Sequence, residues 1–227
     1  MSAVLANDAQ SFIWWDWVDG HRDLIWNATL EHLRLTVIAV AVGLLIAGAL
    51  SVISLRFRWT YAPITWITGV LYTIPSLALF VLLVPWTGFT TLTGEIGLVS
   101  YTLLILVRNI VAGVDGVPEP VREAADAMGY RPARRFFEVD LRLATPAIVA
   151  GLRIATVTTI GLVTVTGLIG LGGYGALIVD QGVRRGFFST PIVVGSGLSI
   201  AMAIVLDVGL AGVERLLTPW ARRTVAR

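Results

Sequence analysis

Residues 35–55 read LTVIAVAVGLLIAGALSVISL, a stretch of 21 residues without a charged side chain. A helix of about 20 apolar residues matches the roughly 30 Å hydrocarbon thickness of a bilayer. Arg56 and Arg58 follow directly and close the stretch. Its length and composition therefore predict a transmembrane helix.

Four more stretches have the same character, which makes the predicted fold all-α: a polytopic membrane protein of about five transmembrane helices. The second stretch follows Pro63 and contains Pro75, which cannot donate a helix hydrogen bond and breaks the ladder. The predicted spans are residues 35–55, 64–86, 92–112, 147–170 and 192–213.

The composition supports this class and excludes several others. The chain has 227 residues, of which 56% are hydrophobic and 14% charged, with a mean hydropathy of +0.80. Soluble domains carry roughly a quarter charged residues. Cysteine is absent, and all 17 basic residues are arginine, so the chain has no thiolate site and no P-loop lysine. ATP hydrolysis, if it drives this protein, takes place in another chain.

The arginines predict the orientation, because loops retained in the cytoplasm carry the excess of basic residues. The N-terminus is then outside and the C-terminus inside, with only Arg184 and Arg185 against this assignment. We attribute the sequence pI of about 9.4 to these loops and expect no nucleic-acid partner. The arginines on the predicted cytoplasmic side are Arg56, Arg58, Arg122, Arg131, Arg134, Arg135, Arg142, Arg215, Arg222, Arg223 and Arg227.

The N-terminal segment has a distinct composition, with Trp14, Trp15, Trp17 and Trp26 among aspartates. Tryptophan is enriched at membrane interfaces, so we expect either an interfacial helix or a frayed anchoring extension. Residues 1–10 lack the features of a cleaved signal peptide. We divide the chain into an outer segment (1–30), a membrane domain (31–217) and a basic cytoplasmic tail (218–227).

No enzyme site is visible. Residues 170–175 match the GxGxxG pattern, but that pattern binds dinucleotides only between a strand and a helix. After a membrane span it predicts a sharp turn or a close backbone approach.

The cytoplasmic loop of residues 113–146 contains the most informative segment. Pro118 and Pro120 open a short helix, Glu119 and Glu123 complement its N-terminal dipole, and Gly129 supplies the left-handed residue that ends it. Its apolar side chains follow a helical period. They can be buried against the protein's own membrane domain, which periodicity alone favours, or against a cytoplasmic partner. The apolar face comprises Val121, Ala124, Ala125 and Met128, opposite Arg122 and Asp126.

A resemblance favours the partner. Glu123-Ala124-Ala125, then Gly129 and Val139-Asp140-Leu141, resemble the EAA loop of bacterial ATP-binding-cassette (ABC) importer permeases. Residues 72–79, residues 169–175 and the pair Arg108-Asn109 are similar to the permeases of glycine betaine, choline and carnitine importers. The resemblance extends from about residue 31 to residue 214. Two positions depart from it: Arg142 stands where the EAA loop has proline, and Ile105 replaces a proline before Arg108.

The resemblance implies that this chain is a transport subunit, and that a cytoplasmic ATPase dimer holds ATP and Mg²⁺ while the chain itself holds no cofactor. It also implies a second permease copy or a sister permease, and an extracytoplasmic solute-binding protein. The ATPase-coupling residues would be Val121, Glu123, Ala124, Ala125, Met128 and Gly129. Glu123 would orient or cap this coupling helix, the two alanines would allow close approach, and Gly129 would set the bend.

The path of the small solute is expected near the break at Pro75, with Tyr72, Thr73 and Ser76 on or near it. Asn109, near the end of the third span, is a further candidate for the path. Asp207 lies inside the last span, where an ionisable group must face the bundle or water. It either lines the path or pairs with an arginine such as Arg153.

Other functions remain open in the sequence. One alternative is an importer permease of the same superfamily for methionine or another amino acid. The chain could also be a channel, an ion-driven carrier or a membrane scaffold, none of which needs an ATPase for its activity.

Overall fold

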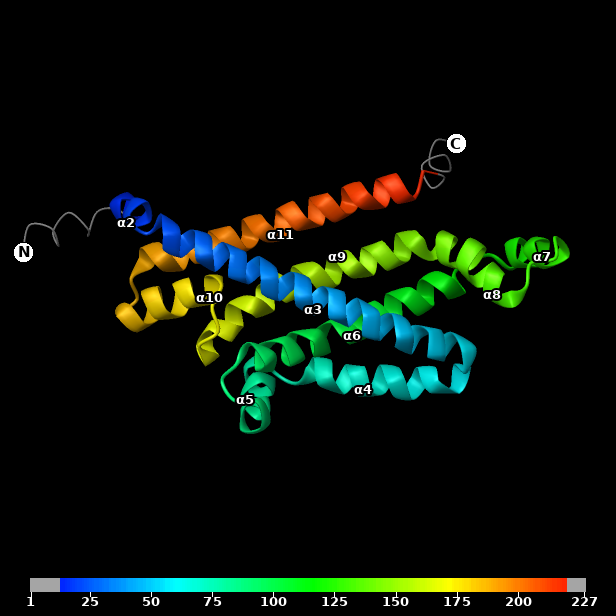
Figure 1. Ribbon diagram of the computed structural model, residues 1–227, viewed down its shortest axis with the longest axis horizontal. Helices are drawn as coiled ribbons and strands as arrows, with labels where there is room; N and C mark the ends of the chain where they lie inside the picture. Colours follow the sequence, from blue (N-terminus) through cyan, green and yellow to red (C-terminus); the bar gives the residue numbers. More distant parts are fainter. Residues whose placement is uncertain (1–12, 220–227) are drawn as a thin grey trace, which may run out of the picture. The chain divides into compact units, whose positions relative to one another are not determined.

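The computed structural model describes residues 13–219, and all regular structure within them is helical (Figure 1). Residues 1–12 and 220–227, which hold the start of the outer segment and most of the basic tail, lie outside this part. The helices in chain order are α2 (Trp15–Gly20), α3 (Arg22–Arg56), η1 (Arg58–Thr60), α4 (Tyr61–Thr73), α5 (Ser76–Thr87), α6 (Thr91–Asp115), α7 (Glu119–Ala127), α8 (Pro132–Arg135), η2 (Phe136–Asp140), α9 (Leu141–Thr166), η3 (Gly167–Ile169), α10 (Tyr174–Ala176), η4 (Leu177–Gly182), η5 (Val183–Arg185) and α11 (Ser189–Leu217).

Four helices among these residues are long and apolar enough to cross a membrane: α3, α6, the stretch Pro132–Ile169 that contains α9, and α11. The second predicted span is a bent pair, Arg58–Thr73 and Ser76–Thr87, with an angle of 99° between its halves. Proline has no N–H and pushes the preceding residue out of the helical region, so Ile74-Pro75 ends α4 and starts α5. The all-α class is confirmed, and the predicted break in the second span is present.

Two boundaries differ from the expected ones. Helix α3 begins at Arg22, so residues 22–30 are in the same helix as the span at 35–55. The loop of residues 113–146 is largely helical, and Pro146 lies inside α9. Arg142 keeps the N–H that a proline would lack, and the chain passes from α8 through the π-helical turn η2 into α9 without a break.

The described residues form two compact units. The first comprises residues 13–39, 74–98 and 158–204, and the second comprises residues 40–73, 99–157 and 205–219. Helices α3, α6, α9 and α11 each contribute residues to both.

The first unit is organised around His32, which has no exposed surface. Its Nδ1 accepts a hydrogen bond from the N–H of Tyr174 (3.2 Å), which leaves the protonated Nε2 to donate to the carbonyl oxygen of Ile160 (3.2 Å). The Tyr174 ring packs against the imidazole at 4.5 Å. One buried histidine thereby joins α3, α9 and α10.

The glycine-rich segment before α10 is a turn, as predicted. Gly170 and Gly173 have φ of +79° and +71°, in the left-handed region where glycine is favoured. A Cβ on Gly175 would collide with the carbonyl oxygen of Thr164, and one on Gly167 with the backbone of Gly175. Glu31 accepts a hydrogen bond from the N–H of Gly173 (3.1 Å). The GxGxxG pattern therefore reflects a tight turn and close backbone packing.

Helix α2 packs within the same unit through Trp17, which is 6% exposed and lies edge-on to Phe188 at 5.8 Å. Trp15 and Trp26 are 67% and 62% exposed. The described part of the N-terminal segment is thus a packed helix with outward-facing tryptophans.

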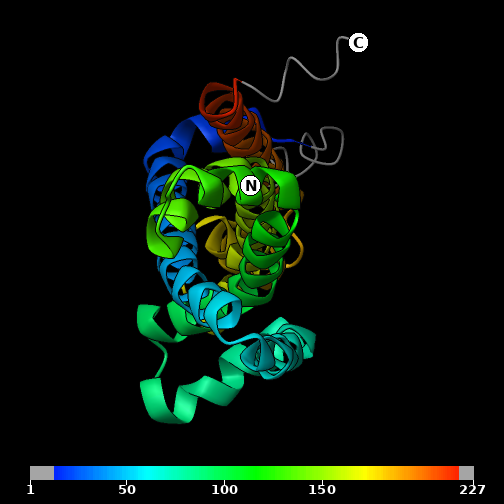
Figure 2. The ribbon, with the colours of Figure 1, turned by 90° about the vertical axis from the view of Figure 1, so that its right-hand side faces the viewer.

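The second unit has an apolar core where residues of α3, α6 and α9 meet, with α4 beside them through Tyr61 and Ile64. A Cβ on Gly43 would collide with the hydroxyl of Thr102, so this glycine lets α3 and α6 approach closely. The buried core residues are Ala47, Leu106, Val107, Ile110, Val111 and Ala155. Figures 1 and 2 show α7 and α8 beyond the ends of α6 and α9 in this unit.

Candidate functional site

Helix α7 forms where the sequence predicted a short helix between the third and fourth spans. Pro120 occupies its first turn and Glu119 its N-terminus, where a carboxylate complements the helix dipole. At the other end Gly129 has φ +83°, and the N–H of Tyr130 donates to the carbonyl oxygen of Ala125 (3.2 Å). This left-handed C-terminal motif ends the helix, as expected for Gly129.

The covered face of α7 differs from the one that periodicity favoured. Ala125 is buried (2% exposed), but Ala124 is exposed, and Val121 and Met128 are 37% and 71% exposed. The side chain of Arg122 is turned inward instead, with 18% exposed. Of the two alternatives for this apolar face, burial on the protein's own membrane domain does not hold for Val121, Ala124 and Met128, whose side chains are exposed. These three side chains form an uncovered apolar surface, which we call the α7 surface.

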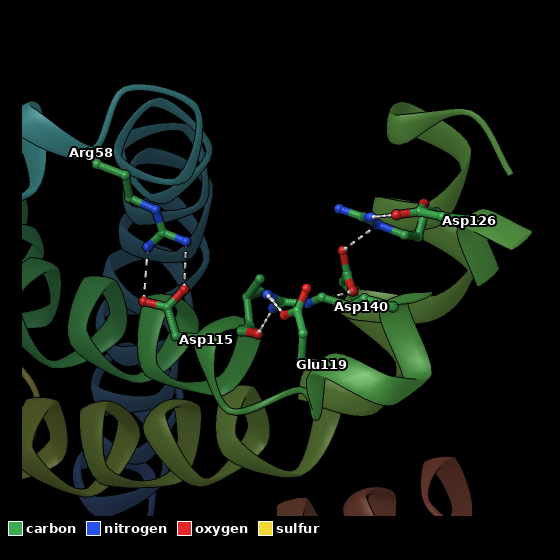
Figure 3. A network of polar contacts seen from close by, with 8 residues as sticks. Arg58, Asp115, Glu119, Asp126 and Asp140 are labelled. Atoms are coloured by element: carbon green, nitrogen blue, oxygen red, sulfur yellow. Dashed lines mark hydrogen bonds and ion pairs between the residues drawn. The ribbon is translucent and has the colours of Figure 1, made fainter. Parts of the chain in front are cut away.

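The inward position of Arg122 is explained by its polar contacts. Its Nη2 donates to the carbonyl oxygen of Val114 at the end of α6 (2.6 Å), and its Nε lies 3.4 Å from Asp140. A weaker contact of 3.7 Å joins it to Glu119. Arg122 therefore ties α7 to both α6 and the π-helical turn η2 (Figure 3).

Asp140 is shared by a second arginine. Arg135 of α8 lies 3.7 Å from Asp140 and also pairs with Asp126 of α7 (Figure 3). The Asp140 side chain is 7% exposed, and neither arginine Nε has hydrogen-bond geometry toward it. The buried Asp140 carboxylate thus attracts two mostly buried guanidinium groups electrostatically, without a hydrogen bond to either Nε. The sequence analysis quoted Asp140 only as part of a motif; a charged residue between Val139 and Leu141 was the available signal.

A third arginine braces the end of α6. Arg58 of η1 makes a bidentate pair with Asp115, at 2.8 and 2.7 Å (Figure 3). Both side chains are about half exposed, at 58% and 42%. This pair links the turn after α3 to the residue that ends α6.

Glu123 lies on the exposed side of α7, at its fifth residue, and any capping role for it stays a prediction.

The residues expected along the solute path lie in several places. Tyr72 packs edge-on against Tyr101 at 5.8 Å, and Thr73 donates its hydroxyl to the carbonyl oxygen of Val70 (2.8 Å). Asn109 donates from Nδ2 to the carbonyl oxygen of Ile105 (2.8 Å). The polar groups of Thr73 and Asn109 are therefore hydrogen-bonded within their own helices, α4 and α6.

Two other expected path residues, Pro75 and Ser76, begin α5 in the first unit. Contact of these residues with the solute stays a prediction.

Asp207 pairs with Arg153, the arginine that the sequence suggested. The two contacts are 2.8 and 2.9 Å, and Glu214 adds a third at 3.4 Å. The side chains of Arg153 and Asp207 are about one-third exposed, and the pair joins α9 to α11.

Glu95 was missed by the sequence analysis although it lies inside α6, a predicted span. Both carboxylate oxygens are shielded from solvent and accept no hydrogen bond from residues 13–219. Arg34 of α3 is close enough to act on it electrostatically. An ionisable residue inside a hydrophobic stretch was the signal that could have found it.

The comparisons with known proteins identify the family. Residues 25–223 match the model of the binding-protein-dependent transport system inner membrane component. The chain belongs to this family of ABC importer permeases. It is a multi-pass protein of the inner membrane, and its family implies an ATPase and a binding protein as separate partners.

Relatives and solved structures agree with this assignment. The permease is 33% identical to the choline transport system permease protein OpuBB of Bacillus subtilis, over 84% of this chain and 87% of the relative. It is 33% identical to the osmoprotectant import permease protein OsmW of Salmonella typhimurium, over 85% and 91%. An inward-facing MetNI methionine ABC transporter superposes with a TM-score of 0.75 at 22% identity, over 88% of this chain and 98% of the other. That last likeness establishes the fold alone.

Proposed function

We propose that this permease moves a quaternary-ammonium osmoprotectant into the cell, driven by ATP hydrolysis in a separate subunit that docks on the α7 surface. The observation that carries the coupling role is the exposure of Val121 and Met128 on a helix whose opposite side is held by Arg122. An uncovered apolar helix face suits helix-in-groove docking. The solute class is supported by the names of OpuBB and OsmW, which concern choline and osmoprotectants.

The proposed topology places α7 in the cytoplasm, the N-terminus outside and the C-terminus inside. Arginines gather at the end of α3, between α6 and α9, and at the end of α11, and these places share one side of a five-span chain. The pair Arg184-Arg185 is on the other side. In this arrangement the ATPase meets α7, and the binding protein delivers solute to the opposite end.

The partners proposed are an ATPase dimer that holds ATP and Mg²⁺, an extracytoplasmic solute-binding protein, and a second permease that is either identical or a sister chain. Because every basic residue is arginine, ATP hydrolysis through a P-loop lysine belongs to the partner. We propose no catalytic role and no cofactor for the permease itself.

The geometry of α7 supports a mechanism for coupling. Closure of the ATPase dimer would move α7, and the Arg122–Asp140–Arg135 contacts would carry that movement to α8, the π-helical turn and α9. Coupling needs contacts that differ between two states, and a short clamped helix can change its position as one piece. The spans would then alternate between inward-facing and outward-facing states.

Two alanines of α7 provide a matched test of docking. Both Ala124 and Ala127 are exposed, but only Ala124 shares a helix face with Val121 and Met128. We expect Ala124→Glu to abolish ATP-driven uptake in proteoliposomes and ATPase co-purification, and Ala127→Glu to preserve both. Equal behaviour of the two variants would contradict docking on this face.

A bulky residue at Ala125 or Gly129 tests the same proposal in another way. Ala125 is buried and Gly129 has a positive φ, so Ala125→Trp and Gly129→Val should displace α7. We expect a permease that is still inserted in the membrane but inactive in uptake. Normal transport by either inserted variant would reject the coupling role.

The solute and the transport class are tested by uptake in proteoliposomes that contain the permease, its ATPase and its binding protein. We expect choline, carnitine or glycine betaine to compete for uptake, whereas methionine should not. Liposomes that contain the permease alone should show no uptake. ATP-independent transport would instead favour a channel or an ion-driven carrier.

A further inference from the structure

A cavity of about 640 Å³ lies within the second unit, beside the end of α3 and the α7–α8 segment. Four arginines contribute to its wall: Arg56, Arg58, Arg122 and Arg135. Asp140 is the only acidic residue among the lining residues, and most of the others are apolar. A wall of guanidinium groups and hydrocarbon suits an anion with an apolar part.

Apart from Asp140, the carboxylates that pair with these arginines are not among the residues that line the cavity. Asp115, Glu119 and Asp126 pair with them but do not line the cavity. The bidentate contact of Arg58 with Asp115 uses two of the five N–H groups that a guanidinium carries. Donors therefore remain for a ligand.

Arg56 is the arginine without a counter-ion. It ends α3, its side chain is exposed, and its guanidinium lies over the Phe57 ring at 5.6 Å. It forms no ion pair with a carboxylate among residues 13–219. A planar guanidinium is well suited to bind phosphate oxygens in a bidentate manner.

The apolar part of the wall indicates what carries the anion. Val52 and Leu55 belong to the last turns of a membrane-spanning helix. Phe137 of η2 also lines the cavity, and 64% of its surface is exposed. Trp59, just after Arg58, is 78% exposed. Exposed tryptophan at the end of a span marks the level of the lipid headgroups. The cavity therefore opens where the phosphate of a phospholipid lies.

We propose that this cavity is a binding site for a phosphate group, supplied by the headgroup of an anionic phospholipid. Arg56 contacts the phosphate, Arg58 and Arg122 add donors, and the acyl chains run along Val52 and Leu55. Basic pockets between transmembrane helices on the cytoplasmic side bind acidic headgroups by this chemistry. The site belongs to the permease alone and does not depend on its solute.

The test uses the assembled transporter, permease with its ATPase, in detergent. Native mass spectrometry would measure binding of dioctanoyl phosphatidylglycerol, of dioctanoyl phosphatidylcholine, and of inorganic phosphate as a competitor. We expect phosphatidylglycerol to bind the wild type at least about tenfold more tightly than phosphatidylcholine, and Arg56→Gln to remove most of that difference.

Arg131→Gln is the matched control, because Arg131 is exposed in the same region and does not line the cavity. It should bind phosphatidylglycerol like the wild type. Arg56 makes no ion pair, so its replacement should leave the complex intact, which co-purification of the ATPase would verify.

Displacement of the lipid by millimolar inorganic phosphate would support the phosphate site and assign it to the free ion as well as to the lipid. Equal binding of the two lipids, or equal loss in Arg56→Gln and Arg131→Gln, would overturn the proposal. Exclusion of phosphatidylglycerol from the assembled complex but not from the permease alone would also overturn it, because an acidic segment of the ATPase would then occupy the cavity.

Discussion

Two groups of ion pairs in the second unit have opposite charges at their centres. At the α7–α8 segment, two arginines surround one buried carboxylate, Asp140. Between α9 and α11, two carboxylates surround one arginine, Arg153. The first group joins short helical segments, and the second joins two long helices. We call the first group, Arg122–Asp140–Arg135, the clamp, because it holds the short helix α7. We call the second group, Arg153 with Asp207 and Glu214, the brace, because it joins two spans.

Burial, and the kind of group left unpaired, decide how much stability a substitution in each group should cost. Asp140 is 7% exposed and its arginines are 18% and 26% exposed, so removal of the carboxylate leaves two poorly solvated cations. Arg153 and Asp207 are each about one-third exposed, and the carboxylates that loss of Arg153 would leave can take up a proton, whereas a guanidinium cannot lose its charge. The clamp should thus be far more sensitive to substitution than the brace.

The largest effect is expected from Asp140→Asn. The amide keeps the shape of the side chain but removes the carboxylate that Arg122 and Arg135 share. The two arginines keep only the more exposed carboxylates of Glu119 and Asp126, so we expect a cost of about 1–3 kcal/mol. We expect loss of coupled uptake and faster hydrogen exchange across residues 119–140, measured on the purified transporter.

Glu138→Ala is the matched control for Asp140→Asn. Glu138 is two residues away and pairs only with Arg134 at the surface, so its loss should cost less than about 1 kcal/mol. If both variants exchange and transport like the wild type, Asp140 is no clamp.

A smaller effect is expected from Arg153→Met, which leaves Asp207 and Glu214 without their arginine. We expect a lower thermal midpoint of the purified transporter and unchanged exchange of α7. The double variant Arg153→Met with Asp207→Asn should recover part of that loss, because it removes one of the two unbalanced charges.

Uptake by the Arg153→Met, Asp207→Asn double variant separates the two interpretations of Asp207. A stable double variant that transports at the wild-type rate would identify the pair as structural. A stable variant without transport would place Asp207 on the solute path.

The brace was predictable and the clamp was not, for physical reasons. Arg153 and Asp207 are both ionisable residues inside apolar stretches, and each needs a partner of opposite charge there. The positions of the spans follow from hydropathy in the same way. Pro118, Pro120 and Gly129 likewise gave the bounds of α7, since their backbone preferences are local.

The orientation of α7 depends on contacts distant in sequence. Periodicity placed Val121 and Met128 on the buried face, but Arg122 turns inward because Val114 and Asp140 receive it. These two partners of Arg122 lie in other elements, α6 and η2, so no local pattern in the sequence predicts the contacts. The same holds for His32, whose partners Ile160 and Tyr174 are more than a hundred residues away along the chain.

The smallest effect is expected at Arg58–Asp115, which lies near the clamp but is exposed like the brace. The bidentate geometry at 2.7 and 2.8 Å is as good as that of Arg153–Asp207. Because both side chains are about half exposed, Asp115→Asn should cost at most about 1 kcal/mol, and the cost should shrink further at high salt. Thermal unfolding of the transporter at low and high ionic strength would measure it. The Arg58–Asp115 pair also anchors the end of α6, from which α7 departs. If Asp115→Asn lowered stability as much as Asp140→Asn, the contribution of an ion pair would depend on which elements it joins and not on its burial.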